Sequence, residues 1–252
     1  MFELATHLAL FLILAAFVAG FVDSIAGGGG LITVPALLLA GADPVVVLGT
    51  NKLQGTFGSG TATLAYARAG HVRLRDQAGM ALVSVIAGGV GALFAAAIPA
   101  DVLRLVMPVI LVAVAAFFAL KPGISDADRV ERMRPAVFTF TIVPLIAAYD
   151  GFFGPGTGAF FMLGFVMLAG FGLLRATAHT KLLNFGSNIG SLAVFAATGS
   201  IWWVTGFAMA LGQTAGAALG ARLAMRVGAR LIKPLLVVTS TAMAARLIWQ
   251  ML

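Results

Sequence analysis

Two aspartates and two lysines lie within or at the edge of long apolar stretches of this sequence. They are Asp23, Lys52, Asp150 and Lys181, so each half of the chain carries one residue of each kind. If the stretches lie in a bilayer, a charge at its centre costs about 2.5–3.5 kcal/mol even on the lower, insertion-based scale. We therefore interpret the four charges as functional.

Each lysine begins a polar face on a predicted helix. The residues at helical spacing are Lys52, Thr56, Ser59 and Thr63 in the first half, and Lys181, Asn184, Asn188 and Ser191 in the second. Two such faces around one cavity would offer positive charge and hydrogen-bond donors, which suit an oxyanion. With Asn51 and Thr180, which precede the lysines, the predicted substrate-binding side chains are Lys52, Lys181, Asn51, Thr56, Ser59, Thr180, Asn184 and Asn188. Alternatively, the lysines snorkel to the membrane interface and hold helix ends.

Glycine-rich motifs follow both aspartates, G-G-G-G at 27–30 and G-P-G-T-G at 154–158. Glycine permits an unwound backbone and the close approach of a ligand. A helix that begins there would point its N–H groups, which attract anions, at the motif. We therefore add Gly28, Gly29, Gly156 and Thr157 to the predicted site, with close helix packing by small residues as the alternative.

The roles of the two aspartates stay open. Asp23 and Asp150 could pair with the lysines, cap the unwound turns, or take up protons during transport. His179 stands where the first half has Thr50 and could tune the site, although a lone histidine at a loop edge is more often simply polar.

Composition indicates a membrane protein. Of the 252 residues 61% are hydrophobic and 10% charged, against roughly 25% charged residues in soluble domains. The formal charge of +7 fits basic loops that set membrane topology better than a nucleic-acid partner. The absence of cysteine excludes disulfides and thiolate chemistry. We predict no metal, no cofactor and no catalytic residue, and the chain has no Walker A motif.

Apolar stretches recur along the chain. They cover 4–22, 31–48, 53–67, 77–98, 102–120, 136–149, 157–171, 182–198, 203–221 and 231–251. Because a crossing needs about 17–25 residues, short stretches such as 136–149 and 157–171 indicate broken or re-entrant helices. The sequence leaves open whether 4–22 with 31–40, and 136–149 with 157–171, span fully or fold back as hairpins. The predicted fold is an all-α polytopic membrane protein.

The two halves resemble each other. V-D-S-I-A-G-G-G-G corresponds to Y-D-G-F-F-G-P-G-T, T-N-K-L-Q-G to H-T-K-L-L-N, and R-L-V-M-P near residue 104 to R-L-I-K-P near residue 230. We predict an N-terminal transmembrane repeat over 1–120, a linker over 121–135 and a C-terminal repeat over 136–252, each with about five helical segments.

Basic and non-basic loops exchange places between the halves. The 68–76 loop is arginine-rich and its counterpart near 198–203 is not, whereas 222–230 is arginine-rich and its counterpart near 98–101 is not. By the positive-inside rule the repeats are inverted, with the linker in the cytoplasm and both termini outside. Five crossings per half satisfy this topology, and so do three crossings plus one re-entrant hairpin.

At these motifs the chain resembles the TauE/SafE family of bacterial membrane proteins. The resemblance rests on V-D-S-I-A-G-G-G-G-L-I-T-V-P at 22–35, G-T-N-K at 49–52 and the second copy, D-G-F-F-G-P-G-T-G with H-T-K. It implies a secondary transporter in the bacterial inner membrane that exports sulfite or an organosulfonate. The residues themselves predict only an anion transporter that works by alternating access, with lipid around it and a possible homodimer.

Three other functions compete with the transport of sulfite or an organosulfonate. A transporter of another small organic acid would use the same site. A cation channel or exchanger would use Asp23 and Asp150 as ligands, although the lysines argue against it. An intramembrane aspartyl protease would need a G-x-G-D motif, which is missing.

Overall fold

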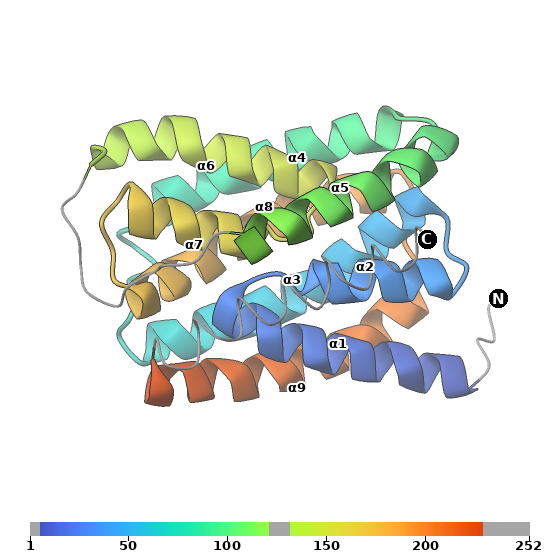
Figure 1. Cartoon of the computed structure of the whole chain (residues 1–252), viewed down its shortest axis with the longest axis horizontal. Helices are drawn as coiled ribbons and strands as arrows, with labels where there is room; N and C mark the ends of the chain where they lie inside the picture. The colour runs from blue at the N-terminus through green and yellow to red at the C-terminus, as the bar shows by residue number, and fades with distance from the viewer. Residues whose placement is uncertain (1–5, 121–131, 229–252) are drawn as a thin grey trace.

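A computed structural model describes residues 6–120 and 132–228, and within these ranges the chain forms nine helices and no strands. Figure 1 shows them as a bundle of roughly side-by-side helices. Their bounds are α1 Thr6–Ala26, α2 Gly30–Leu39, α3 Pro44–Arg68, α4 Ala78–Ala97, α5 Ala100–Leu120, α6 Pro135–Phe152, α7 Thr157–Met167, α8 Leu173–Ala197 and α9 Trp203–Val227. The expected segment at 231–251 and both chain termini lie outside the described residues.

Apart from the α1–α2 and α6–α7 turns, which lie in the interior, the described connections between helices gather at two ends of the bundle (Figure 1). At one end, the N–H groups of Arg132 and Met133 both donate to the Leu168 carbonyl at 3.0 Å, which joins the start of α6 to the end of α7. At the other end, Arg104 forms a 2.6 Å ion pair with Asp43, which joins the start of α5 to the loop before α3. The chain therefore returns repeatedly to the same two faces.

Charge is distributed unequally between these ends. One end, which we call the basic end, contains Arg68, Arg73, Arg75, Asp76, Arg132, Arg134, Arg175, Arg222 and Arg226. Among the described residues of the opposite end, the charged ones are Asp43 in a loop and Asp101 and Arg104 at the start of α5. The two ends therefore carry the charge imbalance that orients a protein across a membrane.

Two helices are too short to cross a bilayer. The ten residues of α2 and the eleven of α7 extend about 15–17 Å, half of a hydrocarbon core of about 30 Å. Each follows a turn of positive-φ glycines, at Gly27 and Gly28 before α2 and at Gly154 and Gly156 before α7. The α6–α7 unit folds back on itself, since the end of α7 is hydrogen-bonded to the start of α6.

Several of the expected apolar segments have different bounds in the structure, and the largest differences concern 31–48, 53–67 and 182–198. The stretch 31–48 is not one helix, because α2 ends at Leu39 and α3 begins at Pro44, nine residues before the expected start at 53. Gly41 has φ +84° and proline is favoured in the first turn of a helix, so the chain breaks between them. Likewise α8 begins at Leu173 rather than at 182.

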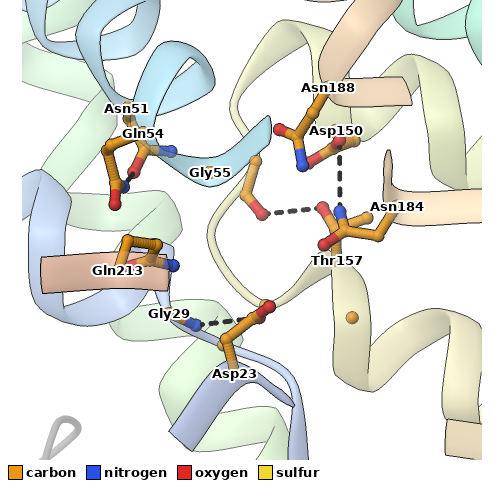
Figure 2. A pocket seen from close by; sticks show the side chains of 15 residues that line it. Asp23, Gly29, Asn51, Gln54, Gly55, Asp150, Thr157, Asn184, Asn188 and Gln213 are labelled. Carbon is orange, nitrogen blue, oxygen red and sulfur yellow. Dashed lines mark hydrogen bonds between the residues drawn. The ribbon is translucent and has the colours of Figure 1, made fainter. Parts of the chain in front are cut away.

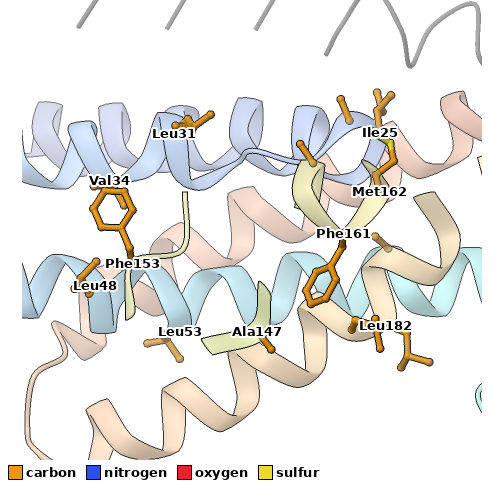
Figure 3. Close-up of a cluster of buried hydrophobic side chains, with 14 of the residues drawn as sticks. Ile25, Leu31, Val34, Leu48, Leu53, Ala147, Phe153, Phe161, Met162 and Leu182 are labelled. Atoms are coloured by element: carbon orange, nitrogen blue, oxygen red, sulfur yellow. The ribbon is translucent and has the colours of Figure 1, made fainter. Parts of the chain in front are cut away.

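Apolar side chains cover the outside of the bundle as well as its core. Phe153 and Phe161 are among the largest fully buried side chains, near the two glycine turns (Figure 3). Leu14 of α1, Phe94 of α4 and Phe140 of α6 are 64–71% exposed. Helices α1, α4 and α6 are long and apolar enough to span a membrane. An exposed apolar surface on such helices is typical of a protein surrounded by lipid.

The long helices pack through glycine against backbone. The first helix of each half packs on the fourth helix of the other half, α1 on α9 and α6 on α4. A Cβ on Gly91 would lie 1.9 Å from the Ala148 carbonyl oxygen of α6, and one on Gly151 would lie 1.8 Å from the Gly88 carbonyl oxygen of α4. Such contacts replace the hydrophobic driving force that is missing between helices in lipid.

We expect Gly91→Ala to lower the stability of the protein by about 1–3 kcal/mol or more, because the new methyl group overlaps the α6 backbone. The matched control is Gly79→Ala on the same helix, since a Cβ there meets nothing within 4 Å. Thermal unfolding in detergent should show a lower midpoint for the first variant and an equal or higher one for the second. Equal midpoints would mean that α4 and α6 are not packed this closely.

Candidate anion site at the crossing of two glycine turns

The two glycine turns touch each other in the middle of the protein. A Cβ on Gly27 would lie 2.3 Å from the Ala159 backbone nitrogen, and one on Gly158 would lie 2.9 Å from the Gly27 Cα. A Cβ on Gly30 would lie 3.2 Å from the Pro155 Cα. The two motifs, far apart in sequence, therefore form one site, and glycine is needed at Gly27 and Gly158 for them to meet.

Each buried lysine pairs with the aspartate of the other half. The Lys52 Nζ lies 2.8 Å from Asp150 Oδ1, and the Lys181 Nζ lies 3.1 Å from Asp23 Oδ2. The lysine side chains are 1% and 0% exposed, and their partners are 3% and 13% exposed. A buried charge without a partner would be strongly unfavourable, so the pairs explain how four charges can persist at this depth.

Further hydrogen bonds hold both carboxylates. Asp23 Oδ1 accepts from the Gly29 N–H at 3.2 Å, across the first glycine turn. Asp150 Oδ2 accepts from Ser187 Oγ at 2.5 Å and from Asn184 Nδ2 at 3.4 Å. The sequence left the roles of the two aspartates open. In the structure both aspartates form ion pairs, and Asp23 also accepts a capping hydrogen bond from the unwound turn.

A small polar cavity lies where the turns meet (Figure 2). Its volume is about 30 Å³, the share of one water molecule in the liquid. Besides Thr157 at the start of α7, its polar side chains come from the five long helices α1, α3, α6, α8 and α9, and they are Asp23, Asn51, Gln54, Asp150, Asn184, Asn188 and Gln213. The wall therefore combines amide groups with two carboxylates that are already neutralised.

The first turns of both short helices also border the cavity. Gly29 and Gly30 belong to the start of α2, and Gly156 and Thr157 to the start of α7. Helix N-termini carry partial positive charge and free N–H groups, which makes them anion-binding elements. Since the two ion pairs leave the site without net charge, these termini and the amides are what can attract an oxyanion.

Some residues of the expected polar faces do not border the cavity in this structure. Neither Lys52 nor Lys181 borders the cavity, and the ammonium group of each pairs with a carboxylate that does. Thr56 donates to the Lys52 carbonyl at 2.7 Å, and Ser59 to the Gly55 carbonyl at 2.7 Å. Neither hydroxyl lines the cavity, nor does Thr180, whose buried hydroxyl has no partner within the described residues.

The other residues predicted to bind substrate do border the cavity. Asn51, Asn184 and Asn188 border it, as do Gly28, Gly29, Gly156 and Thr157. His179 does not, because it lies in a separate hollow beside Gln77.

Sequence reasoning missed the two glutamines in the wall. Gln54 donates to Asn51 Oδ1 at 2.8 Å and to Thr33 Oγ1 at 3.2 Å, and its own Oε1 has no partner in the described chain. Gln213 Oε1 is likewise buried without a described partner. The position of Gln54, three residues after Asn51 on one helix face, could have identified it. Gln213 is an isolated polar side chain buried in α9, which is a weaker indication.

Comparisons with known proteins agree with the resemblance of the motifs. The family model described as "Sulfite exporter TauE/SafE" matches residues 12–247. The chain is 59% identical over 246 residues to "Probable membrane transporter protein ORF9" of Sinorhizobium sp, covering 98% of this chain and 94% of that one. It is 44% identical over 238 residues to "Probable membrane transporter protein YfcA" of Escherichia coli K12, covering 94% and 88%. A Haemophilus influenzae protein with the name "Probable membrane transporter protein" is 40% identical over 247 residues, covering 98% and 97%. No solved structure matches the chain.

Proposed function

The chain belongs to the TauE/SafE family of membrane transporters, and from this premise we propose that it exports sulfite or a small organosulfonate through the cavity between its glycine turns. Membership makes it a multi-pass membrane transporter rather than an enzyme. The observation that carries the proposed substrate class is the convergence of two helix N-termini and several amide side chains on one cavity. Sulfite itself comes from the name of the family.

The chemistry of the wall favours an oxyanion over a neutral or cationic substrate. The three oxygens of a sulfite or sulfonate group can accept hydrogen bonds from backbone N–H groups and from Asn51, Asn184 and Asn188. The neutralised aspartates do not repel the anion as free carboxylates would. This arrangement binds the anion without a free ammonium, which would hold it more strongly and slow its release.

We propose that transport proceeds by alternating access between two inverted repeats. Support comes from the reciprocal pairings, since the first helix of each half packs on the fourth helix of the other and each lysine pairs with the aspartate of the other half. Within this scheme, the short helices α2 and α7 with their glycine turns are re-entrant elements at the midplane. The cavity of about 30 Å³ is smaller than a sulfonate group, so binding must widen it.

We also propose that the basic end faces the cytoplasm. The arginines of that end are the residues that the positive-inside rule keeps on the cytoplasmic side. The described start of the chain, at Thr6, would then lie on the outer face (Figure 1). Proton uptake by Asp23 or Asp150 during the cycle stays part of this proposal, because both carboxylates border the cavity through which the anion would pass.

A thermal-shift screen of the purified protein tests the substrate class. We expect sulfite or a small sulfonate such as taurine or sulfoacetate to raise the unfolding midpoint, since a ligand at 100 times its Kd adds about 2.7 kcal/mol. Sulfate and matched carboxylates serve as controls. A response to carboxylates alone would replace this proposal with transport of an organic acid.

A cation exchanger is the second candidate, favoured by one observation. Asp23 and Asp150 both line the cavity, and carboxylates are ligands for cations. Reversal potentials measured in proteoliposomes under separate anion and cation gradients distinguish the two. A potential that follows the sulfite gradient supports the anion transporter, whereas one that follows the cation gradient excludes it.

A further inference from the structure

A second polar hollow lies at the basic end, away from the glycine turns. Its volume is about 290 Å³, close to the lower limit of ordinary ligand pockets. The loop after α3 provides one wall, with His71, Arg73, Asp76 and Gln77, and the first turns of α8 provide the other, with Arg175 and His179. Asp76 lies 4.0 Å from Arg73, which offsets its negative charge, so Arg175 is the cation left to an anion. We call these six residues the basic hollow.

The Arg175 side chain at the rim of the basic hollow is held in position by an aromatic ring. The Arg175 guanidinium carbon lies 3.9 Å from the centre of the Phe171 ring, which itself stacks on Phe165 with ring centres 5.4 Å apart. Arg175 forms no ion pair within the described residues, so the edge of its guanidinium group is available to an anion. A stacked, pre-positioned guanidinium group loses little entropy when it binds an oxyanion.

Polar groups line the inner wall of the hollow. The amide of Gln77 contacts His179 Nδ1, while the Gln77 Oε1 is buried without a partner in the described chain. With the amide nitrogen donating to Nδ1, the neutral imidazole carries its proton on Nε2 and is itself a donor. Two rings, Phe165 and Phe171, lie edge-on to the same imidazole at 5.7 and 4.8 Å between centres.

The corresponding region at the opposite end is closely packed. Thr50, which aligns with His179, accepts a 3.0 Å hydrogen bond from the Trp202 N–H. A Cβ on its neighbour Gly49 would lie 2.0 Å from the Ser200 carbonyl oxygen. A helix and a loop can therefore meet at this position without leaving a hollow between them.

We propose that the basic hollow is a loading site, where the transported oxyanion binds weakly on the cytoplasmic side before it reaches the central cavity. The inference rests on the proposed function, because it assigns the same sulfite or sulfonate to a second site. His179 and Asn184 lie five residues apart on α8, so one helix borders both sites. The phosphate of an anionic lipid has the same oxyanion chemistry and is the other possible source of a ligand.

The test compares Arg175→Gln with Arg75→Gln, since Arg75 is exposed at the same end but does not line the hollow. We expect Arg175→Gln to raise the half-saturating sulfite concentration for flux about tenfold through the loss of a charge-assisted hydrogen bond, with the maximal rate unchanged. Arg175→Lys keeps the charge and should restore most of the affinity. Flux is measured with radiolabelled sulfite in phosphatidylcholine vesicles and in vesicles that also contain phosphatidylglycerol.

Several results would overturn the loading site. They are an Arg175→Gln variant that matches Arg75→Gln, an effect that appears only with phosphatidylglycerol, and a Lys variant as impaired as the Gln variant. The second would assign the hollow to a lipid headgroup, and the third would make Arg175 a structural partner of Phe171. If the wild-type protein carried no sulfite flux at all, the proposed function would fail together with the loading site.

Discussion

Replacing Lys52 by methionine is expected to destabilise the protein by about 3–5 kcal/mol, because the Asp150 carboxylate stays buried without its counter-charge. Methionine has nearly the length of lysine, so little packing is lost. Chemical or thermal unfolding in detergent measures the change. We expect Lys181→Met to destabilise the protein as well, but by less, because its partner Asp23 is 13% exposed whereas Asp150 is only 3% exposed.

The double variant Lys52→Met with Asp150→Asn separates charge from packing. Removing both charges of a buried pair is often neutral, so we expect most of the lost stability to return. The asparagine introduced in this variant could still accept the Ser187 hydrogen bond through its carbonyl oxygen. A double variant as unstable as the single one would show that Lys52 contributes through its packing and not through the ion pair.

The combined replacement of Asn184 and Asn188 by leucine is expected to weaken sulfite binding by roughly 100-fold or more, since each of the two hydrogen bonds to an anion contributes about 1.5–3 kcal/mol. Both amides border the cavity, and their hydrogen bonds within the protein are long, at 3.4 and 3.5 Å. The Kd from thermal-shift or calorimetric titration gives the result.

Thr56→Val is the matched control for the two asparagines. Thr56 lies on α3, its hydroxyl is satisfied by the Lys52 carbonyl, and it does not border the cavity. We expect its sulfite affinity to match the wild type. If the control weakened binding as much as the asparagine variant, or if the asparagine variant bound normally while folding normally, the anion would bind elsewhere.

The sequence predicted the elements of the site better than their mutual arrangement. The all-helical fold and the four buried charges could be read from apolar stretches and the polar residues that interrupt them. Glycine runs after Asp23 and Asp150 predicted the turns, because only glycine readily adopts the positive φ found at Gly27 and Gly154.

The partners of these residues could not be predicted, because they lie far apart in sequence. The pairing of Lys52 with Asp150 and of Lys181 with Asp23 depends on how the halves interlock. Helical spacing placed the lysines on polar faces but could not show that each ammonium group pairs with a carboxylate of the other half. Gln213 is a single polar residue in α9, and only the fold brings it to the cavity.

The start of α3 was misplaced for a local reason. The residues from Pro44 to Leu48 are almost all apolar and continue the run that begins before Leu39, so hydropathy alone joined them to the preceding helix. The break follows instead from Gly41 and from proline at the start of α3. Glycine and proline end or begin a helix through their backbone preferences, even where the sequence around them stays apolar.

A structure of the protein with bound selenite tests the central claim most directly, because selenite resembles sulfite and its selenium gives an anomalous signal. We expect the strongest selenium peak between the first turns of α2 and α7, within hydrogen-bonding distance of the Gly29–Gly30 or Gly156–Thr157 backbone and of Asn184 or Asn188. A protein that transports selenite but shows no peak between these turns would contradict the site.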